Sequence, residues 1–168
     1  MRVTATVKTA LMMAVWGALG GSAQAATCDV SPVTSINVPR YSAADLFSVS
    51  AQYGLNVSCA ADALDAPGAS VNLLIGISNG SSPSSTVRTM MGPNGARLEY
   101  NLYSSASATV PWGDAPSTSA AVIVGPLTLF GVPVRPMIEP QIWLVIRAGQ
   151  WSIPAGLYTD SLVVTLTF

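Results

Sequence analysis

Apolar and polar residues alternate along most of this chain, a spacing that is typical of β-strands with one buried face. The C-terminal segment 158–168 shows the alternation most clearly. One face of this strand is expected to be wholly apolar, with Leu162, Val164, Leu166 and Phe168 on it. Because neither charge nor proline follows Asp160 to blunt its edge, the strand either lies inside a completed sheet or pairs with another chain.

Further alternating segments predict about seven short strands in a single domain. The predicted strands are 30–38, 47–51 with 55–59 after a break at Gly54, 71–77, 97–103, 121–130, 142–147 and 161–168. Stretches rich in Ser, Gly, Pro and Asn lie between them, at 78–85, 92–95 and 114–119. Only 41–47 could form even a helical turn. The pattern predicts an all-β sandwich.

The first 25 residues have the pattern of a signal peptide. Arg2 and Lys8 are basic, residues 11–19 are apolar, and Ala23-Gln-Ala25 fits a cleavage site. The alternative, a membrane anchor, needs about 20 apolar residues, roughly twice this run. We therefore expect export, cleavage after Ala25, a mature domain of residues 26–168 and no membrane insertion of the mature chain.

Two cysteines, Cys28 and Cys59, remain in that mature domain. A disulfide is expected in an oxidising compartment, and the alternative is two separate buried thiols. The bond would tie the start of the mature chain to the strand 55–59. Closing a loop of about 30 residues would stabilise the fold by roughly 3–4 kcal/mol.

Charge is scarce, since Asp, Glu, Lys and Arg make up 9% of the chain against about 25% in typical proteins. Residues 26–168 contain five arginines, eight carboxylates and no lysine. This mildly acidic balance offers no basic patch for a phosphate backbone, so nucleic acid is not an expected partner.

No set of residues suggests catalysis. The chain has no histidine, which removes the usual general base and the commonest metal ligand. The carboxylates are scattered, and Asp62 with Asp65 is only a weak candidate for calcium. Phosphate-binding loops and nucleophile elbows are missing from the sequence. We expect no enzyme activity, no cofactor and no metal.

Three motifs occur together in the mature chain. The first is Arg88-Thr-Met-Met-Gly, followed by Leu98-Glu-Tyr-Asn-Leu-Tyr103 and Trp112-Gly-Asp114. The second is Ala155-Gly-Leu-Tyr-Thr-Asp160 before the terminal strand, and the third is the cysteine pair, whose second member ends Asn56-Val-Ser-Cys59. In this combination the chain resembles the spore coat protein U-like domain of archaic chaperone–usher pilus subunits.

The resemblance implies an incomplete immunoglobulin-like β-sandwich that is completed by a donated strand. A periplasmic pilus chaperone would insert a strand beside Leu162, Val164, Leu166 and Phe168. At the outer-membrane usher, a neighbouring pilin subunit would replace it. The implied function is structural or adhesive, in a cell-surface pilus that supports attachment and biofilm formation. Tyr100, Tyr103, Trp112 and Tyr158 are expected to pack in the core and at corners.

Two features depart from that family pattern. Rod subunits carry a donor strand before the first cysteine, whereas only Ala26 and Thr27 would precede Cys28 here, so we expect a tip or minor subunit. The chain also has an additional apolar, proline-rich segment at 130–146. This segment could be an extra hairpin packed on the sandwich, or an adhesive loop that exposes Met137, Ile138 and Trp143.

Two other classes of protein are alternatives. A self-sufficient secreted β-sandwich of a spore or cell coat would fold without a chaperone. A carbohydrate-binding module would need a row of exposed aromatic side chains, and the few aromatics here are expected to be buried.

Overall fold

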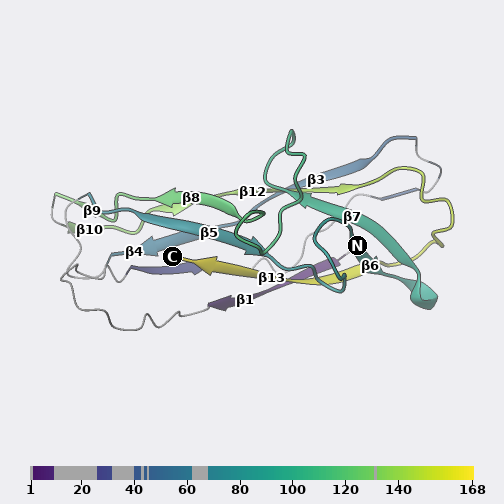
Figure 1. The fold of residues 1–168 in the computed structure, drawn as a ribbon, viewed down its shortest axis with the longest axis horizontal. Helices are drawn as coiled ribbons and strands as arrows, with labels where there is room; N and C mark the ends of the chain where they lie inside the picture. Colours follow the sequence, from purple (N-terminus) through teal and green to yellow (C-terminus); the bar gives the residue numbers. More distant parts are fainter. Residues whose placement is uncertain are drawn as a thin grey trace.

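A computed structural model describes residues 2–9, 26–31, 40–42, 44, 46–61, 68–130 and 132–168, and for residues 2–9 the backbone alone. The described chain is all-β, which confirms the predicted fold class, and it forms an elongated sandwich (Figure 1). The strands are β1 (Arg2–Thr9), β2 (Thr27–Val30), β3 (Val49–Gly54), β4 (Val57–Ala60), β5 (Val71–Ile77), β6 (Arg88–Met91), β7 (Arg97–Tyr103), β8 (Ala120–Val124), β9 (Thr128–Leu129), β10 (Val132–Pro133), β11 (Met137–Ile138), β12 (Gln141–Ile146) and β13 (Thr159–Thr167). A 3-10 turn, η1 (Pro93–Gly95), joins β6 to β7.

Hydrogen bonding connects most strands in the order β3-β12-β7-β6-β13-β5-β8, with β1 on the free side of β13. Thr159 and Met91 are the only register pair between β13 and β6. The strands on either side of this narrow junction are the two layers of the sandwich. β11, β4 and β2 form a smaller antiparallel sheet that extends the layer of β3, and β9 with β10 forms a hairpin.

The core lies between these layers and is built from alternate residues. In β12 the buried residues are Ile142, Leu144 and Ile146, and in β5 they are Leu73, Ile75 and Ile77 together with Gly76. β7 and β13 contribute their own alternating apolar positions to the same cluster. The alternation of apolar and polar residues that predicted these strands therefore matches the alternation of buried and exposed side chains in the structure.

Some predicted boundaries differ from the structure. β5 and β7 have the predicted bounds, whereas the predicted strand 121–130 is two strands because Pro126 lacks the N–H that a continuous ladder needs. Of the predicted strand 30–38, β2 contains only the first residue, and 32–39 lie outside the described residues. The described members of the predicted helical turn 41–47 form bends and a turn.

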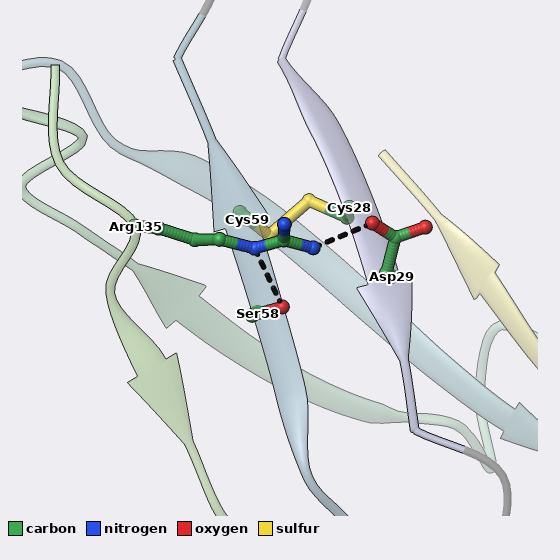
Figure 2. Close-up of polar contacts among 5 residues, drawn as sticks. All are labelled: Cys28, Asp29, Ser58, Cys59 and Arg135. Carbon is green, nitrogen blue, oxygen red and sulfur yellow. Dashed lines mark hydrogen bonds and ion pairs between the residues drawn. A yellow bond between two sulfur atoms is a disulfide. The ribbon is translucent and has the colours of Figure 1, made fainter.

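The additional segment 130–146 joins the sandwich through β11 and β12. β11 pairs with β4, so that Met137 lies opposite Ser58, and β12 joins the central sheet. Figure 2 shows how Arg135, just before β11, donates to Asp29 of β2 at 2.7 Å and to Ser58 of β4 at 3.1 Å. Both members of the Arg135–Asp29 ion pair are largely exposed, so this pair contributes less than about 1 kcal/mol. Backbone pairing of β11 with β4 and of β12 with the central sheet is therefore the main attachment of the segment 130–146 to the sandwich.

The predicted disulfide is confirmed. Cys28 and Cys59 are directly opposite each other in β2 and β4, and their sulfur atoms are bonded (Figure 2). Both residues are buried. The bond holds β2, the first strand of residues 26–168, against the rest of its sheet.

Replacing Cys28 and Cys59 together by serine should lower the free energy of unfolding by about 3–4 kcal/mol, because the unfolded chain regains the entropy of a loop with a sequence separation of 31. Urea unfolding of the full chain, residues 1–168, in which β1 pairs with β13, measures the difference between the oxidised protein and the double variant. Reduced wild-type protein is the matched control. Equal midpoints for oxidised and reduced protein would contradict this account of the bond.

Candidate functional site

The terminal strand β13 is held along one edge by β5. Residues Val164–Thr167 pair with β5, and the N–H and C=O of Val163 both bond to Ser78, the residue after β5. The distances are 2.8 Å from Val163 N to Ser78 Oγ and 2.9 Å from Ser78 N to Val163 O. Because backbone groups alternate along a strand, the N–H and C=O groups of Leu162 and Val164 face the opposite edge.

That opposite edge is occupied by β1 in parallel orientation. All eight residues of β1 are in register with β13, from Arg2 opposite Thr159 to Thr9 opposite Leu166. β1 and β13 run side by side, roughly in the direction of the long axis (Figure 1). Among the described residues from 26 onward, no strand pairs with this edge. Within the described part of the chain, this edge is therefore paired only with a segment that the sequence assigns to the signal peptide.

The predicted groove residues lie along β13 but differ in burial. Leu162, Val164 and Leu166 are buried in the core, with exposures of 2–3%. Phe168 follows the end of β13 and is 47% exposed, so it extends past the paired strand. Three of the four predicted side chains thus form the apolar base of the edge, and the fourth lies at its end.

Asp160 anchors the start of β13 in a buried polar cluster. Its carboxylate accepts hydrogen bonds from the Tyr100 hydroxyl at 2.6 Å and from the backbone N–H of Ser81 at 3.0 Å. The Ser81 hydroxyl and the N–H of Ser161 also donate to it, each at 2.9 Å. Gly80 allows this approach, because its φ is +63° and a Cβ there would overlap the Asp160 carboxylate.

Burial raises the pKa of Tyr100 well above its ordinary value of 10.0, and the hydrogen bond to Asp160 and the negative charge of that carboxylate raise it further. Tyr100 therefore stays protonated and remains a donor throughout the physiological range. This neutral donor lets Asp160 be buried without an ion pair, since hydrogen bonds from several donors stabilise its charge.

Arg88 forms a second part of the cluster. Its guanidinium is fully buried and donates to the backbone carbonyls of Ser78 at 3.0 Å, Ile77 at 3.0 Å and Trp112 at 2.6 Å, with a longer contact of 3.4 Å to Ser85. Burial lowers the pKa of Arg88, and the neighbouring Tyr100, Asp114 and Asp160 oppose that shift. These bonds join the end of β5 to β6 and to the turn at Trp112.

The sequence motifs therefore meet in space. Trp112 donates from its indole nitrogen to Ile75 of β5 at 2.7 Å, and Asn101 donates to Thr86 at 2.6 Å. Arg88, Tyr100, Trp112 and Asp160, which lie far apart in the sequence, all contribute to the buried connections around β5 and β13. Their combination is that of a structural core and not of a ligand site.

A sequence profile of the Spore Coat Protein U domain matches residues 15–165. The chain belongs to the Spore Coat Protein U domain family. This domain is that of chaperone–usher pilus subunits, and the family consists of exported surface and coat proteins. A search among curated proteins gave no match to the chain.

In this member of the family, β9 and β10 form an apolar hairpin at one end of the long axis (Figure 1). Leu129, Phe130 and Val132 are exposed there, and the Phe130 side chain is as accessible as in an unfolded chain. Phe130 also has a φ of +51°, an unfavourable value for a bulky residue. An exposed aromatic side chain on a strained turn suggests a function.

The three residues of the predicted adhesive loop are not placed alike. Met137 is 69% exposed on β11. Ile138 is half-buried and packs against the core. Trp143 is half-buried within β12, opposite Tyr103 and Gln52, so it belongs to the central sheet and not to a loop. The predicted segment 130–146 contains Phe130 and Val132, but sequence reasoning assigned the adhesive contacts to Met137, Ile138 and Trp143. It placed Leu129 in the predicted strand 121–130.

Several predictions fall on other parts of the chain. The apolar run 11–19, the cleavage motif 23–25, and Asp62 and Asp65 lie outside the described residues. Within the described part, no helix is long and apolar enough to cross a membrane. The same residues contain no cluster of three or more groups suited to a metal.

Replacing Tyr100 by Phe should lower the free energy of unfolding at pH 7 by about 1–3 kcal/mol, because Asp160 loses a buried donor. The folded pKa of Tyr100 is raised above 10.0, so its contribution is complete below about pH 10 and falls at higher pH, by at most about 1.4 kcal/mol per unit. The difference between wild type and variant should therefore shrink above pH 10. Urea unfolding from pH 7 to 12 tests both points.

Tyr103→Phe, on the same strand and half-buried, is the matched control and should change stability little. A Tyr103→Phe loss as large as that of Tyr100→Phe would show that the bond to Asp160 is not the cause.

Proposed function

We propose that this protein is a non-enzymatic subunit of a cell-surface pilus, and that the outer edge of β13 accepts a strand from another polypeptide. The observation that supports this is the pairing of β13. β5 and β6 occupy one edge, and only β1 occupies the other among the described residues. Once the predicted signal peptide is removed, no strand among the described residues pairs with this second edge.

The physical driving force for such an acceptor is large. A strand added at the edge would bond the backbone groups of Leu162 and Val164 that face away from β5. Its alternate side chains would cover the apolar core along β13. Several hundred Å² of newly buried apolar surface, at about 25 cal/mol per Å², corresponds to roughly 10 kcal/mol. An unfilled subunit is therefore expected to be unstable by itself.

In the family's pathway, the first strand donor would be a periplasmic chaperone. The second would be a neighbouring pilin, exchanged at the outer-membrane usher. The subunit would then pass through the periplasm to the cell surface. No cofactor or metal has a role in this scheme.

A terminal position in the pilus is supported by β2. This strand begins at Thr27, and Cys28 is already bonded to Cys59. With cleavage after Ala25, the mature chain would have no free segment of strand length to donate. It would accept a strand but could not supply one, as a tip or minor subunit does.

The apolar hairpin suits surface attachment. Phe130 and Val132 are 102% and 61% exposed, and Met137 is 69% exposed. Only 9% of the residues of the chain are charged, so few ions have to lose hydration water when the protein contacts an apolar material. We infer that this end supports adhesion and biofilm formation.

A self-sufficient spore- or cell-coat protein is the second candidate. The observation that favours it is the extent of the buried core, which includes a disulfide and a polar cluster without any added chain. Such a protein would need no chaperone.

When the chain is exported without a chaperone of the chaperone–usher class, it should be degraded or aggregate. With the chaperone it should accumulate as a one-to-one complex. Periplasmic yield and pull-down measure the outcome. Accumulation of a soluble, stable monomer without the chaperone would favour the coat protein instead.

Val164→Pro sharpens that test. It removes an N–H that faces the open edge and leaves the bonds between Val163 and Ser78 in place. Chaperone capture should fall at least tenfold, whereas the matched Val164→Ala variant, which keeps the N–H, should still be captured. Retention of the disulfide reports that each variant folds. Equal capture of the two variants argues against strand addition at this edge.

Replacing Phe130 and Val132 by serine should weaken attachment of the fibre to apolar surfaces by about 1.5–3 kcal/mol for each side chain that is buried on contact. Secretion should be unchanged, because both side chains are exposed. Met137→Ser should act in the same direction. Retention of cells on polystyrene under flow measures the effect.

Trp151→Ser is the matched control. Trp151 is 67% exposed and belongs to the connection between β12 and β13. This connection extends to the end of the long axis opposite β9 and β10 (Figure 1). The control variant should attach like wild type. If Trp151→Ser weakens attachment as much as the hairpin variant does, the hairpin is not the specific site of adhesion.

A further inference from the structure

The end of the molecule opposite the β9–β10 hairpin carries a second group of exposed apolar side chains. Trp151 and Leu157 lie in the connection between β12 and β13, which extends to this end (Figure 1). Leu46 and Phe47 lie just before β3, whose first residue is level with the last residue of β12. The exposed fractions of these four side chains range from 63% to 82%. We call the four residues the basal patch.

The part of the connection that carries Trp151 is fixed to the sandwich by Gln150. The Gln150 side chain accepts from the N–H of Glu99 at 2.8 Å and donates to the Glu99 carbonyl at 3.0 Å, which ties it to β7. Its backbone N–H donates to the hydroxyl oxygen of Tyr41 at 3.1 Å. The N–H of Ile153 donates to the Gln150 carbonyl at 3.3 Å and closes a turn around Trp151.

The part that carries Leu157 is fixed as well. The hydroxyl of Tyr158 donates to the carbonyl of Pro154 at 2.6 Å. Gly156 lies so close to Pro93 of η1 that a Cβ at this position would overlap the proline ring. The basal patch is therefore presented on a preorganised loop, and a partner that binds there does not have to order it first.

Charged side chains lie beside the basal patch. Arg147 directly follows β12, and Arg97 and Glu99 are in the first half of β7, to which Gln150 is bonded. All three charged residues are exposed. Protein interfaces commonly have an apolar centre with aromatic residues and a polar rim, and arginine is enriched in them. The arrangement therefore favours a folded protein as the partner of this patch.

The basal patch is too small to hold a partner that diffuses freely. Four side chains of this kind offer on the order of 500 Å² of apolar surface, whereas a stable protein interface takes about 800 Å² from each partner. A tethered partner has a local concentration of about millimolar, so a small contact is enough to hold it. The size of the patch therefore fits a protein that is joined to this domain by another attachment.

The acceptor edge of β13 supplies such an attachment and determines where the donor lies. β13 begins at Thr159, two residues after Leu157, and runs toward the hairpin end (Figure 1). β5 is antiparallel to both of its neighbours, and antiparallel pairing is the more stable per residue. A donor strand that is antiparallel to β13 leaves the edge beside Thr159. In a pilin whose donor strand precedes its first cysteine, the folded body follows the strand and lies at the basal patch.

We propose that the basal patch binds the folded body of the neighbouring pilin that donates its strand to β13. The proposal rests on the proposed function of β13 as an acceptor, and it adds a second contact to the donated strand. The strand joins the two subunits, and the patch sets the angle between them. The hairpin lies at the other end of the long axis (Figure 1), outside this contact.

Photo-cross-linking in assembled fibres tests the contact. Cells that produce the whole pilus receive this chain with p-benzoylphenylalanine in place of Trp151, and the isolated fibres are irradiated. The expected product joins this chain to one pilin, at peptides that follow the donor segment of that pilin. Val110, which is 60% exposed in the connection between β7 and β8, is the matched control position. It should give at least tenfold less of this product.

The outcomes separate this contact from the acceptor function. Fibres that contain the chain but give no such product from position 151 overturn the contact alone. A product from position 130 instead places the body of the neighbour at the hairpin end and also overturns the contact, while β13 remains an acceptor. Absence of this chain from the fibres overturns the proposed function and the contact together.

A substitution tests the contact without a bulky probe. The Trp151→Ser/Leu157→Ser variant should leave isolated fibres in guanidinium chloride at least tenfold faster than wild type, because only the donated strand still holds it. The matched Val110→Ser variant should leave at the wild-type rate. Without denaturant the strand keeps each variant in the fibre, so attachment of cells should not change. Equal dissociation rates for the double variant and wild type overturn the proposal.

Discussion

The buried guanidinium of Arg88 is the interaction on which the arrangement of the two layers depends. Burial of a charge without compensation is costly, and among the described residues no carboxylate lies within ion-pair distance of Arg88. Backbone carbonyls of Ile77, Ser78 and Trp112 accept its hydrogen bonds instead. Ile77 ends β5, Ser78 follows it, and Trp112 lies in the connection between β7 and β8. The Arg88 side chain therefore satisfies the backbone carbonyls at the end of β5 and holds Ser78 in place. Ser78 in turn forms two hydrogen bonds with Val163 of β13.

Much of the sandwich could be predicted from the chain because its strands have one buried and one mixed face. Apolar and polar residues alternate in four of these strands, and the buried positions follow that alternation; the four are β5, β7, β12 and β13. β6 was not predicted, since it is four residues long and its buried positions are Arg88 and Met90. A charged residue on the buried face conceals the apolar pattern. Only the carbonyls that surround Arg88, which are set by tertiary structure, make that position favourable.

The candidate site was predictable in part for the same reason. The open edge of β13 and its apolar face follow from the sequence of the strand itself. The participation of β1 could not be foreseen, because the basic residues and the following apolar run indicated a signal peptide. The hairpin at Phe130 was predictable only in part. Leu129 and Phe130 were assigned to the predicted strand 121–130 and Val132 to the additional segment after it. Only the interruption at Pro126 and the pairing of β9 with β10 show that these residues form one hairpin.

The direction of the paired edge has a mechanical consequence. β13 runs along the long axis of the molecule, and the pairing beside it extends over eight residues (Figure 1). Tension applied along that axis would shear all the backbone bonds of an attached strand together, instead of peeling them apart one by one. A disulfide also links the neighbouring β2 to β4, so these two strands cannot separate when the domain is under load. A fibre anchored in this way should resist flow far better than its individual hydrogen bonds would suggest.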